Sequence, residues 1–129
     1  MQLLHDRGIC VVIPTYNNGG TIAMVVNDVL QECQDVIVVN DGSTDNTSDT
    51  LHSIEGITIV EYCCNKGKGF ALRCGFKRAL EKGFSYAITI DADGQHYAID
   101  IAKFLIENQK NPGALIVGNR KMEGVERSK

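Results

Sequence analysis

Asp91, Asp93 and Gln95 occupy alternate positions in the hexapeptide Asp91-Ala92-Asp93-Gly94-Gln95-His96, directly after the apolar run 86–90. In an extended backbone alternate side chains share a face, so two carboxylates and one amide oxygen can project together from the end of a buried strand. Hard oxygen ligands of this kind suit Mg²⁺ or Mn²⁺, which take phosphate oxygens as further ligands. An Asp-x-Asp sequence also forms ordinary polar turns after strands. The rest of the chain must decide between these two interpretations.

Strand-like and helix-like segments alternate along the chain and would position this hexapeptide. Short continuous apolar runs, typical of strands buried on both faces, occur at 9–13, 36–39, 57–62, 86–90 and 114–117. Segments with helical apolar periodicity lie between them, at 21–33, 45–54, 68–82 and 98–110. The alternation predicts an α/β fold with a mostly parallel sheet and helices on both faces.

Start and stop signals accompany two of the predicted helices. Ser43 and Thr44 are candidate N-caps for the helix at 45–54, and Gly83 is the candidate C-terminal stop of the helix at 68–82. The residues of that second helix expected to face the sheet are Leu72, Phe76, Ala79 and Leu80. The charged segment 120–129 is expected to leave the sheet after the fifth strand.

Polar clusters follow the other predicted strands as well. They are Pro14-Thr15-Tyr16-Asn17-Asn18-Gly19-Gly20, Asn40-Asp41-Gly42-Ser43-Thr44-Asp45, Asn65-Lys66-Gly67-Lys68-Gly69 and Gly118-Asn119-Arg120. In open α/β sheets ligands bind outside the carboxyl ends of the strands, where all of these clusters fall. The convergence of acids, amides, lysines and glycines favours a functional site over ordinary loops.

Composition narrows the class of function. A chain of 129 residues is large enough for one domain with its own core, and its formal charge of −3 argues against a nucleic-acid binder. No apolar run is long enough for a membrane span or a signal peptide, which predicts a cytoplasmic chain. The five cysteines include no C-x-x-C pair; Cys10 and Cys74 are expected to be buried thiols, and the adjacent pair Cys63-Cys64 is a poor disulfide or zinc candidate.

Two nucleotide-binding motifs are excluded. Gly67-Lys68-Gly69 has two glycines of a dinucleotide fingerprint but lacks the third, and it follows the third predicted strand rather than the first. The phosphate-loop pattern G-x-x-x-x-G-K-[S/T] does not occur in the sequence.

Taken together, the chain resembles the inverting family 2 glycosyltransferases, whose Rossmann-like nucleotide-diphospho-sugar transferase fold is called type A. The motifs that carry the resemblance, in family order, are Val12-Ile13-Pro14-Thr15-Tyr16-Asn17, Val39-Asn40-Asp41-Gly42-Ser43-Thr44-Asp45, Asn65-Lys66-Gly67-Lys68-Gly69, Asp91-Ala92-Asp93-Gly94-Gln95-His96 and Gly118-Asn119-Arg120. The fourth motif, which contains the family's D-x-D signature, and the last are most similar to the dolichyl- or polyprenyl-phosphate mannosyl- and glucosyltransferase branch. The resemblance implies a truncated form of this fold.

The resemblance also implies roles for residues on the nucleotide side of the site. Pro14, Tyr16 and Asn17 would line the pocket for the base and ribose, Asp41 would accept a hydrogen bond from the base, and Lys68 would lie near the diphosphate. Two of these residues have simpler interpretations: Tyr16 could pack on the sheet edge, and Asp41 could be a turn residue.

For the reacting end, the resemblance implies catalytic roles for Asp91, Asp93 and Arg120. Asp91 would contact the ribose or a metal ion, and Asp93 and Gln95 would hold Mg²⁺ or Mn²⁺. Arg120 would bind a phosphate with its forked guanidinium. His96 could contact the ligand or simply begin the next helix.

The implied reaction transfers a sugar from a UDP- or GDP-sugar to an acceptor, possibly a polyprenyl phosphate, with inversion at the anomeric carbon. In the family, much of the acceptor site and the general base lie beyond the fifth strand. Residues 1–129 are therefore expected to be a single nucleotide-sugar-binding domain, the N-terminal part of a longer enzyme and inactive alone. Any membrane association, at the cytoplasmic face, would come from other parts of that enzyme.

Two other functions remain open. A sugar-1-phosphate nucleotidyltransferase is disfavoured because Pro14-Thr15-Tyr16-Asn17 stands where those enzymes carry a glycine-rich signature. A non-catalytic nucleotide-sugar-binding module is disfavoured by the presence of Asp41, Asp91 and Asp93.

Overall fold

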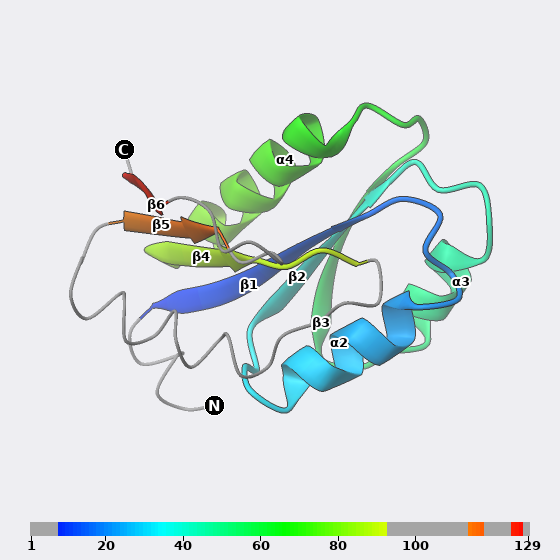
Figure 1. The fold of residues 1–129 in the computed structure, drawn as a ribbon, viewed down its shortest axis with the longest axis horizontal. Coiled ribbons are helices and arrows are strands. Elements are labelled where there is room, and N and C mark those ends of the chain that lie inside the picture. The colour runs from blue at the N-terminus through cyan, green and yellow to red at the C-terminus, as the bar shows by residue number, and fades with distance from the viewer. Residues whose placement is uncertain (1–7, 93–113, 118–124, 128–129) are drawn as a thin grey trace.

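The computed structural model describes residues 8–92, 114–117 and 125–127, whose strands form one mostly parallel sheet (Figure 1). The strands are β1 (Ile9–Thr15), β2 (Val36–Asp41), β3 (Ile57–Tyr62), β4 (Tyr86–Thr89), β5 (Ala114–Val117) and β6 (Val125–Arg127). They lie in the order β3-β2-β1-β4-β5-β6, with β1 to β5 parallel and β6 antiparallel to β5. The predicted α/β fold with a mostly parallel sheet is confirmed.

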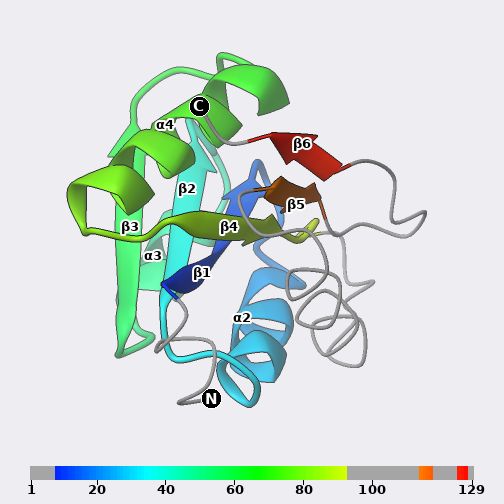
Figure 2. The same ribbon diagram turned by 90° about the vertical axis from the view of Figure 1, so that its left-hand side faces the viewer.

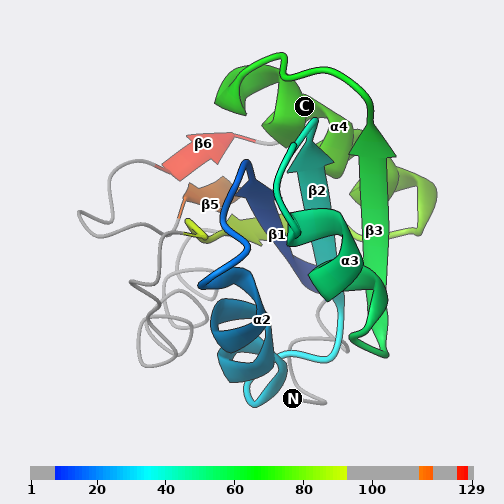
Figure 3. The same cartoon turned by 90° about the vertical axis from the view of Figure 1, so that its right-hand side faces the viewer.

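Helices cover both faces of this sheet, as predicted. The helices are α2 (Ile22–Leu30), α3 (Thr47–His52) and α4 (Lys68–Glu81). Figures 2 and 3 show α4 on one face, with α2 and α3 on the other. Side chains of β1 alternate between the two cores, with Val11 and Ile13 in the cluster beneath α2 and Val12 in the cluster beneath α4.

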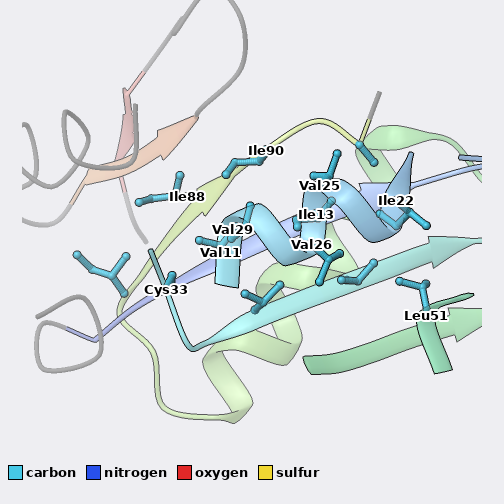
Figure 4. Packing of buried hydrophobic residues seen from close by; sticks show 14 residues of the cluster. Val11, Ile13, Ile22, Val25, Val26, Val29, Cys33, Leu51, Ile88 and Ile90 are labelled. Atoms are coloured by element: carbon cyan, nitrogen blue, oxygen red, sulfur yellow. The ribbon is translucent and has the colours of Figure 1, made fainter. Parts of the chain in front are cut away.

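The α2 face of the sheet is a tightly packed aliphatic layer (Figure 4). The sequence predicts an apolar stripe at Ile22, Val25, Val26, Val29 and Leu30; the first four are fully buried, and Leu30 is partly buried against the same core. They pack with alternate residues of β1, β2 and β4, which places the N-terminus of α2 beside the carboxyl ends of these strands.

Helix α4 approaches the sheet through small residues rather than large ones. Ala71, Gly75 and Ala79 are its buried positions, and a Cβ added at Gly75 would lie 2.4 Å from Val12 Cγ1. The prediction that Leu80 faces the sheet is wrong, since its side chain is 65% exposed. At Gly75 the helix lies so close to β1 that a side chain has no room, while the predicted Ala79 is buried and the predicted Leu72 and Phe76 are partly buried against the same core.

The ends of the helices partly match the predicted signals. Gly83 ends α4 with φ +90°, and the N–H of the next residue, Phe84, donates to the carbonyl of Ala79, so the predicted stop is confirmed. The predicted caps Ser43 and Thr44 are wrong because α3 begins later, at Thr47 after Asn46. Both candidate caps instead take part in contacts with the loop after β1, described below.

The C-terminal segment also differs from the prediction. Instead of leaving the sheet, residues 125–127 form β6 along the open side of β5. The helix predicted at 98–110 lies outside the described residues, as do Asp93, Gln95, His96 and Arg120. Among the helices that are described, none combines the length and apolar character needed to cross a bilayer.

Candidate functional site

A pocket of about 320 Å³ opens at the carboxyl ends of β1, β2 and β4, beside the start of α4. Its volume is at the lower end of the range of small-molecule sites. The residues that line it are Pro14, Thr15, Tyr16, Asn18, Asp41, Asn65, Gly67, Lys68, Ala71, Asp91 and Ala92. The structure thus brings together five of the residues named from the sequence, namely Pro14, Tyr16, Asp41, Lys68 and Asp91.

Asp41 is the buried carboxylate of this pocket, with 3% of its surface exposed. Its Oδ1 accepts hydrogen bonds from Tyr62 Oη at 2.7 Å and Lys66 N at 2.8 Å, and its Oδ2 accepts from Asn65 Nδ2 at 2.8 Å and Gly67 N at 3.0 Å. Four donors match the acceptor capacity of an ionised carboxylate. Asp41 therefore fixes the loop 63–67 that forms one wall of the pocket.

The Tyr62 hydroxyl is protonated and donates its hydrogen bond to Asp41. Burial raises the pKa of the Tyr62 hydroxyl, and the hydrogen bond to Asp41 and the negative charge of its carboxylate raise it further. Whether Asp41 also accepts from a nucleotide base stays a prediction, and such a contact would have to share an oxygen that already has two donors.

Gly42 allows loop 63–67 to approach the end of β2. Its φ of +69° is a left-handed conformation, and an added Cβ would lie 2.3 Å from both Asn65 N and Cys64 C. Both neighbours are main-chain atoms, which cannot rotate out of the way. A glycine is needed here both for the turn and for the close contact.

The loop after β1 is joined to the loop after β2 by Asn17 and Asp45. Asn17, with φ +53°, donates its N–H to Ser43 Oγ at 2.9 Å and accepts at Oδ1 from Thr44 N at 2.8 Å and Asp45 N at 3.3 Å. Asp45 in turn accepts from Gly19 N at 3.0 Å. Asn17, named from the sequence as a pocket residue, is not among the residues that line the pocket; its described contacts are with this second loop.

Asn18 lines the pocket and was not singled out from the sequence. Its Oδ1 accepts from Thr15 Oγ1 at 2.8 Å and from Tyr16 N at 3.1 Å, which fixes the turn that carries the Tyr16 ring. Tyr16 is 45% exposed and does not pack into the core, so its ring offers an aromatic surface at the pocket. The only signal in the sequence was a second asparagine after Asn17.

Asp91 and Lys68 form an ion pair at the pocket, with Lys68 Nζ 2.6 Å from Asp91 Oδ1. The side chains of Lys68 and Asp91 are 57% and 34% exposed, so both remain accessible to a ligand. The neighbouring carbonyl of Ala92 accepts a hydrogen bond from Thr21 Oγ1 at 2.9 Å. Thr21, another residue that the sequence did not single out, therefore fixes the Asp91-Ala92 segment against the start of α2.

Glu61 joins Asn40, the residue before Asp41, to helix α3 through hydrogen bonds. Its carboxylate accepts from Asn40 Nδ2 at 2.9 Å and Ser48 Oγ at 2.7 Å, and it lies 2.8 Å from His52 Nε2. Burial alone would raise the pKa of Glu61, but hydrogen bonds from Ser48, His52 and Asn40 together lower it below its usual value. The network ties β3 and α3 to the residue that precedes Asp41.

The cysteines play no direct part in this arrangement. Burial raises the pKa of Cys10 to about 12 and that of Cys33 to about 11, so both are protonated, inert thiols. Cys74, expected to be buried, is half-buried. The sulfur atoms of Cys63 and Cys64 are exposed and 3.3 Å apart.

A carboxylate oxygen is a ligand that Mg²⁺ and Mn²⁺ take, and of the three predicted ligands Asp91 is the one that lies among the described residues. Asp91 offers a partly exposed hard oxygen at the pocket, while Asp93 and Gln95 lie outside the described residues. Within 8–92, 114–117 and 125–127, no cluster of three or more potential metal-ligating side chains occurs. Metal binding by Asp91, Asp93 and Gln95 therefore stays a prediction.

Comparison with protein families gives a match over most of the chain. Residues 10–129 match the profile of "Glycosyl transferase family 2". The UDP-N-acetylglucosamine–dolichyl-phosphate N-acetylglucosaminyltransferase of Methanococcus voltae is 34% identical over 134 residues, covering 91% of this chain and 53% of the relative. The polyprenol monophosphomannose synthase of Mycolicibacterium smegmatis is 30% identical, covering 88% and 45% respectively.

Two further proteins extend the comparison. The poly-beta-1,6-N-acetyl-D-glucosamine synthase of Staphylococcus aureus is 32% identical, covering 88% of this chain and 28% of the relative. The crystal structure of S. aureus TarS 1-349 superposes with a TM-score of 0.60 and 24% identity, covering 78% of this chain and 33% of that one, and supports the expected type A fold. The chain spans about half the length of the first curated relatives that it matches.

Proposed function

Because the chain belongs to glycosyl transferase family 2, we propose that residues 1–129 form a single domain that binds the nucleotide-diphospho-sugar donor of a longer glycosyltransferase. The observation that carries the proposal is the pocket itself. It combines an exposed aromatic ring, Tyr16, with an accessible cation, Lys68, and an accessible carboxylate, Asp91, at the edge of the sheet where α/β folds bind ligands.

Each side chain has a chemical task in this proposal. Pro14 and the ring of Tyr16 contact the base and ribose, on a loop held in place by Asn17 and Asn18. Lys68 contacts the diphosphate. Asp41 fixes the opposite wall of the pocket. It also accepts a hydrogen bond from the base, at a carboxylate oxygen that it shares with donors of the protein.

The reacting end of the donor lies toward Asp91 in this proposal. Asp91, Asp93 and Gln95 would hold Mg²⁺ or Mn²⁺, and the ion would supply positive charge to neutralise the leaving nucleoside diphosphate. Arg120 binds a phosphate through its two-pronged guanidinium. The acceptor oxygen attacks the anomeric carbon from the face opposite the diphosphate, which inverts its configuration.

The proposed acceptor of the longer enzyme is a polyprenyl phosphate at the cytoplasmic face of a membrane. The names of two of the relatives contain dolichyl phosphate and polyprenol monophosphomannose. A phosphate oxygen is already ionised at neutral pH, so it attacks without a general base, whereas a sugar hydroxyl must lose a proton.

Calorimetry on the 129-residue chain tests donor binding. We expect UDP or GDP to bind more tightly with Mg²⁺ or Mn²⁺ than without, and the enhancement to disappear in Asp93→Ala. Equal affinity with and without metal in the wild type would refute the metal-dependent site. Absence of binding to either nucleotide would refute the donor-binding function.

Transfer assays with radiolabelled UDP- and GDP-sugars test the reaction. The longer protein should label a polyprenyl phosphate, and the 129-residue chain should not. Transfer to saccharides but never to the lipid phosphate would refute the acceptor and leave the donor site intact. Exchange of label between a nucleotide sugar and pyrophosphate would instead identify a nucleotidyltransferase.

A further inference from the structure

The ion pair of Lys68 with Asp91 gives the pocket a cation of its own. Among the described residues that line the pocket, Lys68 is the one positively charged side chain, and Asp41 and Asp91 are the two carboxylates. Asp41 is already satisfied by four uncharged donors. The ammonium of Lys68, 2.6 Å from Asp91 Oδ1, therefore balances the charge of the accessible acid.

This pair is positioned to exchange partners. Side chains that are 57% and 34% exposed form an ion pair of the solvent-accessible kind, which contributes little net stability because water and salt screen it. Lys68 is also the first residue of α4, after Gly67. Its long side chain can therefore change rotamer while its backbone stays in the helix. A diphosphate entering the pocket offers more negative charge than one carboxylate, and it can draw the ammonium away.

We propose that Lys68 is the resident counter-ion of Asp91 in the empty pocket and moves onto the donor's phosphates when the nucleotide binds. The move frees Asp91 Oδ1 for the divalent cation, so the ion binds Asp91 more tightly once the nucleotide has drawn Lys68 away. This inference rests on the proposed donor-binding function and adds to it a coupling between nucleotide and metal binding.

The exchange predicts opposite effects of one substitution on two ligands. Lys68→Gln removes the competing cation, so Mn²⁺ alone should bind more tightly, by about twofold to fivefold for a pair of this exposure. The same substitution removes a phosphate contact, so nucleoside diphosphate without metal should bind about tenfold more weakly, as expected for a lost charged hydrogen bond. A substitution that merely loosened the pocket would weaken both.

Lys66→Gln is the matched control. It removes the same charge two positions away, but the Lys66 ammonium lies over the Phe70 ring, 5.5 Å from its centroid, and Lys66 is not among the pocket-lining residues. A general change in electrostatic field would appear in both variants, whereas exchange at Asp91 would appear only in Lys68→Gln. Lys68→Arg keeps the charge and should retain weak binding of Mn²⁺ alone.

The experiment measures Mn²⁺ binding by electron paramagnetic resonance and UDP and GDP binding by calorimetry on the 129-residue chain. Tighter Mn²⁺ and weaker metal-free nucleotide in Lys68→Gln, with neither change in Lys66→Gln, is the expected result. Unchanged or weaker Mn²⁺ binding in Lys68→Gln would overturn the exchange while wild-type nucleotide binding upheld the donor site. A wild type that binds neither nucleotide would overturn both.

Discussion

Gly42→Ala should damage the pocket far more than an equivalent change elsewhere. The substitution places a Cβ 2.3 Å from Asn65 N and Cys64 C, where ordinary contact begins at 3.4 Å. Loop 63–67 must therefore move by about 1.1 Å relative to β2. The hydrogen bonds from this loop to Asp41 are 2.8 to 3.0 Å long, so a shift of that size breaks or severely weakens them.

The expected cost has two parts. Forcing alanine into the left-handed conformation costs about 1–2 kcal/mol. Each hydrogen bond lost from the Asp41 carboxylate costs about 1.5–3 kcal/mol more, because the acceptor is charged. We therefore expect Gly42→Ala to lower the free energy of unfolding by about 2.5–5 kcal/mol, even if only one of the three loop contacts is lost and the others adapt.

Gly56→Ala separates the two parts. Gly56 also has a left-handed backbone, with φ +86°, but an added Cβ there meets nothing within 4 Å. It should cost only about 1–2 kcal/mol and leave nucleotide affinity unchanged. Urea unfolding gives the two free energies, and calorimetry gives the affinities. If both variants lost the same stability and bound nucleotide equally well, loop 63–67 would not be held against Gly42 as the structure describes.

Two further substitutions test the supports of the pocket. Thr21→Val removes the hydrogen bond to the Ala92 carbonyl and should weaken metal-dependent nucleotide binding about fivefold, the equivalent of one net hydrogen bond. Thr21→Ser keeps the hydroxyl and should restore the affinity. Equal affinity in all three proteins would show that Thr21 does not position Asp91. Because the pKa of Glu61 is lowered on folding, its contribution to stability is complete above about pH 4.5 and is lost as the pH falls through the lower folded-state value. Glu61→Gln should therefore unfold with a shallower loss of stability below pH 4.5 than wild type, as measured by urea unfolding across pH, and an unchanged profile would contradict the network.

The sheet was predictable because burial on both faces leaves a plain signal. Continuous apolar runs such as 9–13 have few alternatives to a central parallel strand, and β1 to β5 all lie where the sequence placed them. Strand β6 gave no such signal, because Val-Glu-Arg is short and mostly polar. The packing of α4 was predicted in part, since Ala79 is buried and Leu72 and Phe76 pack against the core. The prediction for Leu80 was wrong because side-chain size suggests it as a core residue, while the close approach of helix and sheet selects Gly75.

For the candidate site, the sequence predicted which residues lie together at one edge of the sheet, but not which of them contact one another. The rule that ligands bind at the carboxyl ends of parallel strands sufficed to bring Asp41, Lys68 and Asp91 together. Partnerships within the edge could not be read from the sequence, because Asp41 meets donors 21 to 26 residues away through loop geometry. Thr21 and Ala92, 71 residues apart, meet for the same reason.

The two described carboxylates of the pocket illustrate how one residue type is given two different tasks. Asp41 is 3% exposed, and its four donors come from the protein itself, so its charge holds loop 63–67 in position before any ligand arrives. The Asp91 side chain is 34% exposed, and the one side-chain contact described for it is with a lysine that is more exposed still. A saturated carboxylate can organise a wall but has little capacity left for a ligand, whereas a loosely paired one can change partners. The proposal that Asp91 responds to the ligand therefore rests on this difference in burial more than on shared chemistry, while the contacts of Asp41 show that it shapes the pocket.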